Sequence, residues 1–122
     1  LRELKEINYK PRGETWPAIL TIPNTAVLTI DFENATATLS SPNPVFTQNV
    51  QVPQARLLGM IITNDGPNAV YYATNRPLNS GEANAGLRSG ETVTLDFKKP
   101  CIVRLTLTAL VGSSTVRIVG LI

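Results

Sequence analysis

The sequence predicts an all-β domain, an antiparallel β-sandwich or jelly roll of about seven or eight short strands with an N-terminal extended arm. Aromatic residues make up only 6% of the 122 residues, whereas Val, Ile and Thr are frequent and favour the pleated surface of a sheet. Apolar and polar residues alternate in several segments, which turn signals separate at intervals of about ten residues. No helical pattern of about ten residues lies between these segments, which argues against an α/β fold.

The first part of the chain, residues 1–17, differs from the rest. Seven of its residues are charged, and two prolines and a glycine would stop a helix early. We therefore expect an arm that is ordered only when a partner holds it, followed by one β-sandwich domain over residues 18–122. Trp16, the sole tryptophan, is suited to anchor the arm on that partner. Tyr9 and Arg12 belong to the same predicted partner-binding surface.

A first hairpin is predicted around residues 28–39. Apolar residues alternate with Thr and Asp on both sides of Glu33 and Asn34, which form a plausible turn. Residues 40–53 contain three prolines and are expected to form an extended edge or a connection between sheets.

A second hairpin is predicted farther along the chain. Residues 55–63 form a nearly continuous apolar run, typical of a central strand that is covered on both faces. The turn signal NDGPN at residues 64–68 follows, so this strand is expected to pair with residues 69–75. Residues 76–90 are rich in Gly, Asn and Ser and form the longest predicted loop, a length typical of functional or mobile loops.

Three further strands are predicted at residues 92–97, 101–108 and 115–120, where apolar residues again alternate with Thr, Arg or Asp. Their connections, KKP and VGSS, are short, as antiparallel hairpins require. Cys101 begins an apolar run and is expected to be a small buried hydrophobe.

The residue inventory argues against catalysis. The chain has no histidine and one cysteine, so it lacks the commonest general base and the usual ligands of zinc, copper and haem. We expect no catalytic residues, no cofactor and no metal. Asp31 and Asp96 alternate with apolar residues and are expected to point outward from their strands. Asp65 is expected to bond the backbone of its own turn.

Charge and hydropathy restrict the partners. The net charge is +2 with scattered basic residues, which argues against nucleic-acid binding. No apolar stretch approaches the roughly 18 residues of a membrane span. Tyr71 and Tyr72 point to opposite faces of one strand, and the exposed one, with Arg76 and the loop at 76–90, forms a second candidate binding patch.

The C-terminal two-thirds carries a pattern of strands and turns. It comprises IITNDGPNAVYYATN, then GLRSGETVTLDF, then CIVRLTLTALVGSSTVRIVGL. This pattern, over roughly residues 55–122, resembles small β-sandwich structural proteins of tailed bacteriophages, such as capsid decoration and minor virion proteins. The resemblance implies a virion component assembled in the host cytoplasm, a homo-oligomer with a trimer favoured, and a capsid or tail protein as partner.

The function expected from the sequence is therefore that of a non-catalytic virion structural protein, which oligomerises and binds or cements a capsid or tail assembly. One alternative is a ligand-recognition module that binds carbohydrate or a receptor. Another is an accessory domain of a larger surface protein.

Overall fold

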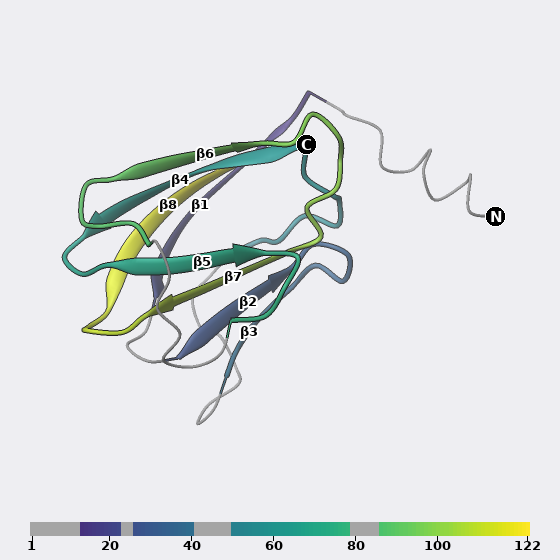
Figure 1. Ribbon diagram of the computed structural model, residues 1–122. Coiled ribbons are helices and arrows are strands. Elements are labelled where there is room, and N and C mark those ends of the chain that lie inside the picture. The colour runs from purple at the N-terminus through teal and green to yellow at the C-terminus, as the bar shows by residue number, and fades with distance from the viewer. Residues whose placement is uncertain (1–12, 23–25, 41–49, 79–85) are drawn as a thin grey trace.

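The protein is a two-layered β-sandwich, as predicted (Figure 1). The computed structural model describes residues 13–22, 26–40, 50–78 and 86–122. Within these residues, sheet A has the strand order β1-β8-β4-β6 and sheet B the order β3-β2-β7-β5. The strands are β1 (Thr15–Ile22), β2 (Val27–Asp31), β3 (Thr36–Leu39), β4 (Gly59–Gly66), β5 (Val70–Thr74), β6 (Thr92–Asp96), β7 (Arg104–Ala109) and β8 (Ser114–Leu121).

The strand pairing is that of a jelly roll. β1 pairs with β8, β2 with β7 and β4 with β6, all antiparallel. A fourth pair is reduced to one bridge, in which Val70 of β5 and Leu87 exchange backbone hydrogen bonds of 2.9 and 2.8 Å. These pairs nest inside one another along the chain, as in one long hairpin rolled into two sheets. β3 is an addition at the edge of sheet B, where it pairs with β2.

Only one of the predicted hairpins has the predicted partners. β2 and β3 pair across the turn at residues 32–35, as the sequence indicated. The other predicted hairpins are wrong: β4, β6 and β8 lie in sheet A, whereas β5 and β7 lie in sheet B. The connections after β4, β6 and β7 therefore cross between the sheets. Alternation of apolar and polar residues reports which face of a strand is buried, and it does not identify the neighbouring strand.

The core fills the space between the sheets. In β1, exposed and buried residues alternate over all eight positions, as expected for a strand with one buried face. The rings of Trp16 in β1 and Phe32, which follows β2, meet edge to face at 5.3 Å and 79°. The largest fully buried side chains come from both sheets and from the segments that connect them: Phe32, Leu20, Ile22, Leu28, Ile30, Leu57, Met60, Ile62, Ile102, Leu105, Leu107 and Ile118.

The predicted turn at residues 64–68 starts later than expected, because β4 continues to Gly66. Asn64 is fully buried, and its Oδ1 accepts the N–H of Gly66 at 2.9 Å. Asn64 therefore has the role that was predicted for Asp65, whose carboxylate instead accepts the Nε–H of Arg117 on β8 at 2.8 Å.

Two further expectations are corrected and one is confirmed. Cys101 is exposed, not buried, because Ile102 enters the core beside Leu57 and the inward alternation resumes only at Leu105. β4 is not covered on both faces, since Ile61 lies half-exposed on the outer side. The side chain of Asp96 points outward, as predicted.

Candidate interaction surfaces

The boundary between arm and domain lies earlier than predicted. The N–H groups of Gly13 and Glu14 both donate to the carbonyl of Ile122, at 3.0 and 3.3 Å, and β1 begins at Thr15. The last residues of the predicted arm at 1–17 therefore belong to the sandwich. Tyr9 and Arg12 lie outside the described residues, so their role in binding stays a prediction.

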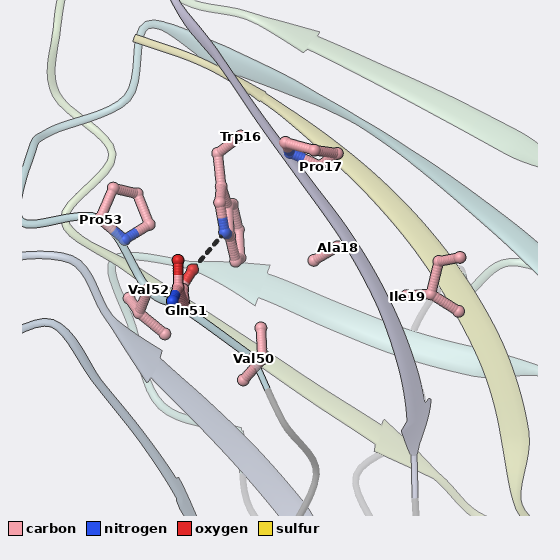
Figure 2. Close-up of a pocket in the computed structure, with 8 residues that line it drawn as sticks. All are labelled: Trp16, Pro17, Ala18, Ile19, Val50, Gln51, Val52 and Pro53. Carbon is pink, nitrogen blue, oxygen red and sulfur yellow. Dashed lines mark hydrogen bonds between the residues drawn. The ribbon is translucent and has the colours of Figure 1, made fainter.

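Trp16 anchors β1 to its own domain rather than an arm to a partner. Only 7% of its surface is exposed, because its ring packs on Phe32 and over Gly120. Its Nε1–H donates to the carbonyl of Gln51 at 2.6 Å (Figure 2). Placing Trp16 in the arm was wrong because its alternation with Pro17 and Ala18 already belongs to a strand with one buried face.

A groove runs beside β1 and is the first candidate surface. It encloses about 670 Å³ between Trp16–Ile19 of β1 and the segment 50–53 (Figure 2). Figure 2 shows Trp16 on the side of β1 that faces this segment, and Pro17 and Ile19 on the other side. The described residues that line the groove carry no charge: Trp16, Pro17, Ala18, Ile19, Val50, Gln51, Val52 and Pro53.

β1 is an edge strand, and its outer backbone groups border this groove. Glu14 and Ile122 exchange hydrogen bonds, and in an antiparallel ladder such pairs alternate. The even-numbered residues of β1 therefore bond to β8, while Thr15, Pro17 and Ile19 direct their backbone groups outward. Among the described residues, none donates to or accepts from these outward groups. Pro17, in the middle, has no N–H to offer.

The outer face of sheet A is the second candidate surface. Apolar residues lie side by side on three neighbouring strands, since Pro17 pairs with Val119 and Val119 pairs with Ile61. Ile19 is 70% exposed and Val119 is 36% exposed. We call Pro17, Ile19, Ile61, Val119 and Leu121 the apolar face.

The outer face of sheet B differs, because the chain itself covers it. Leu78 follows β5 and packs over Val27 and Ala73, so that all three are buried. Below this cover, the Thr106 hydroxyl donates to the carbonyls of Ala73 and Arg76, each at 3.2 Å. In the described part of the chain, Leu78 thus covers part of the outer face of sheet B, whereas Ile19 and Val119 on the apolar face of sheet A stay exposed.

The predicted patch at Tyr71 and Tyr72 is only partly assembled. As predicted, the two rings lie on opposite faces: Tyr72 packs against the core, and Tyr71 is half-buried on the outer side of sheet B. A Cβ at Gly86 would come within 2.5 Å of the Tyr71 ring, so this ring packs closely on the chain before Leu87. The Arg76 guanidinium donates to the carbonyl of Pro77 at 3.0 Å. A binding role for these residues stays a prediction.

The predicted carboxylates lie apart. Asp31 accepts the N–H groups of Glu33 and Asn34 at 2.9 and 3.2 Å, whereas Asp96 accepts that of Lys98 at 3.1 Å. In the described part of the chain, no three His, Cys, Asp or Glu residues come together in a group that could hold a metal ion. The same residues include no helix long and apolar enough to cross a membrane.

Comparison with known proteins adds no relative: no protein-family model, no curated protein and no solved structure matches this chain. The groove and the apolar face were both missed in the sequence. For the apolar face a signal was present, because Pro17, Ile19, Val119 and Leu121 are apolar at the outward positions of strands whose inward positions are apolar too. The groove carried no such signal, since it forms between segments about 34 residues apart in the chain.

Proposed function

We propose that this protein is a non-catalytic assembly module that associates with further copies of itself through the apolar face of sheet A. The observation that carries the proposal is the contrast between the two outer faces. Leu78 covers sheet B from within the same chain, whereas Ile19 and Val119 are left in water on sheet A. Contiguous exposed apolar residues on a sheet mark a surface that another protein covers.

A second copy is the proposed occupant of this face. Burying the side chain of Ile19 would stabilise the association by about 1 to 2 kcal/mol. Val119 would add less, because it is only 36% exposed. The ion pair of Arg117 and Asp65 lies beside these residues on the same face, and charged residues at the rim of an apolar centre are typical of protein interfaces.

The setting that we propose is a virion. Residues 55–122 resemble structural proteins of tailed bacteriophages, and jelly rolls are frequent among viral capsid domains. In this proposal the module forms a homo-oligomer, with a trimer favoured, and cements a capsid or tail assembly.

The test is the molar mass of the full chain in solution, measured by light scattering after size exclusion. We expect an oligomer for the natural sequence and a monomer for Val119→Glu, because the substitution places a charge at the centre of the apolar face. Val111→Glu is the matched control: Val111 is 79% exposed in the turn between β7 and β8, away from that face, and the variant should keep the oligomer. A monomeric natural chain, or an oligomer that survives Val119→Glu, would overturn the proposal.

A further inference from the structure

We propose that the groove beside β1 is the acceptor site for an added β-strand, and that this strand is the N-terminal segment, residues 1–12, of a second copy of the chain. The inference rests on the proposed function, because it requires copies to associate. It adds a second contact between copies, which shares Pro17 and Ile19 with the apolar face.

The chemistry of the β1 edge calls for an extended backbone. Thr15 and Ile19 each direct an N–H and a carbonyl outward, and Pro17 adds a carbonyl. Such a row of alternating donors and acceptors is what an incoming strand pairs with when it extends a sheet. The missing N–H of Pro17 limits the added ladder to a short one, which suits a contact that forms after folding.

The walls of the groove restrict which strand fits. Val50, Val52 and Pro53 line one side, and Trp16 and Ala18 line the other, and none of the described lining residues carries a charge. A charged group placed there would lose its hydration with no partner to compensate it. The added strand must therefore place apolar side chains at alternate positions toward the groove and keep its charges on the opposite side.

Residues 6–10 of the N-terminal segment have this pattern. Ile7 and Tyr9 are two residues apart, so in an extended strand they share one face. Glu6, Asn8 and Lys10 would lie on the opposite face, toward solvent. The segment thus offers two apolar side chains, Ile7 and Tyr9, that point to the same side and would enter the groove together.

The segment also starts in a suitable place. Gly13 is bonded to Ile122 at the end of sheet A, and the groove begins three residues later at Trp16. Twelve extended residues span roughly 40 Å, enough to reach a neighbouring copy. Pro17 and Ile19 belong both to the groove and to the apolar face, so copies that meet on that face bring their grooves to the border of the contact.

The test is disulfide trapping between full-length chains. Two differently tagged chains are co-expressed in a Cys101→Ser background, one carrying Ile7→Cys and the other Gln51→Cys. Gln51 is exposed at the groove, and its bond to Trp16 uses the main-chain carbonyl, so the substitution leaves that bond in place. Under mild oxidation we expect cross-linked heterodimers to form at least about tenfold faster than with Val111→Cys in place of Gln51→Cys, because docking raises the local concentration of the thiols.

Two results would overturn the inference. One is equal trapping at positions 51 and 111. The other comes from a chain that carries both Ile7→Cys and Gln51→Cys. If its disulfide forms only within one chain and never between chains, the segment reverses at residues 10–13 and fills its own groove. If the natural chain is oligomeric and Val119→Glu monomeric while trapping fails, only the groove inference falls. A monomeric natural chain removes the proposed function itself.

Discussion

At the scale of single residues, Asn64 has the most connections of any polar side chain described above. Its Nδ2 group donates to the carbonyls of Asn68 and Leu87 at 2.8 and 2.9 Å, and its Oδ1 accepts the hydroxyl of Ser114 at 2.7 Å as well as the N–H of Gly66. One fully buried amide thus joins β4 to the chain before β5, to the chain before β6 and to the start of β8. Both its donors and its acceptor are used, which is the condition under which a buried polar group is tolerated.

Asn64→Asp should therefore be strongly destabilising. The new carboxylate has no N–H to donate, and it would face two carbonyl oxygens in a site closed to water. We expect the free energy of unfolding to fall by about 3 kcal/mol or more, measured by urea denaturation. Asn68→Ala is the control, since it removes one exposed hydrogen bond to Ser113 and should cost only about 1 kcal/mol. Similar losses in the two variants would contradict the role of Asn64.

Asp31 links stability to pH. Partial desolvation raises the pKa of its carboxyl, but hydrogen bonds from the Asn34 side chain and from the N–H groups of Asn34 and Glu33, together with the charge of Arg104, outweigh that effect and lower the pKa below its usual value. A lowered pKa in the folded state means that the stabilisation is present above the unfolded-state pKa of about 4. It is lost as the pH falls through the folded-state value.

Asp31→Ala should lower the free energy of unfolding by about 1 kcal/mol at neutral pH. The difference from the natural chain should shrink as the pH is lowered below about 4, because the natural carboxylate is then protonated. Denaturation series at several pH values measure this difference. A difference that stays constant down to pH 2 would show that the charge of Asp31 is not involved.

At the scale of elements, the free edge of β1 combines an exposed backbone with a proline. An edge strand with unpaired N–H and carbonyl groups is a template for unwanted pairing between chains, and proline is one way in which natural sheets prevent it. Pro17 lies where its missing N–H faces outward, opposite Val119, so the ladder with β8 loses nothing.

Pro17→Thr would restore the missing donor at the edge. We expect the variant to keep its fold but to aggregate faster on gentle heating, as followed by light scattering, because an uninterrupted edge pairs with other chains more readily. Ile19→Thr serves as the comparison, since it lowers the apolar content of the same edge without adding an N–H. Faster aggregation in both variants, or in neither, would argue against this role of Pro17.

The elements also show what sequence could predict. Most strands and their buried faces followed from the period of two, as in β2, where Leu28 and Ile30 are buried as predicted. β1 was not predicted as a strand, because its outward positions Pro17 and Ile19 are apolar too. The partners of the strands did not follow, because a short connection such as KKP serves equally well to turn within a sheet or to cross between sheets. The sequence pattern could not distinguish a packing role for Tyr71 from a binding role, because a half-exposed ring is expected for both. The groove depends on where residues 50–53 lie against β1, and local patterns contain no such information.

At the scale of the whole molecule, nearly every strand pair joins distant parts of the sequence. β1 pairs with β8 across the length of the domain, and its first residues lie beside Ile122, with the Gly13 N–H 3.0 Å from the Ile122 carbonyl. The two ends of the described domain are thus neighbours, so a covalent join there leaves the arrangement of the strands unchanged.

A circular permutant that joins Ile122 to Gly13 through a short Gly/Ser linker, and opens between Lys98 and Lys99, should fold. These lysines form the exposed connection between β6 and β7, where few contacts are lost. We expect a cooperative unfolding transition within about 2 kcal/mol of the natural chain. A permutant opened between Arg117 and Ile118 should not fold, because the break falls in the strand that lies between β1 and β4.

The pairing of β1 with β8 has a mechanical consequence. A pulling force applied through Gly13 and Ile122 acts on the same end of this ladder, so its hydrogen bonds would be loaded one after another and the two strands would unzip. Strands pulled from opposite ends would instead share the force across all their bonds and resist by shear. Tension applied through the two ends would therefore act along the direction in which the β1–β8 hydrogen bonds resist least. Compression against sheet A would leave these hydrogen bonds without load.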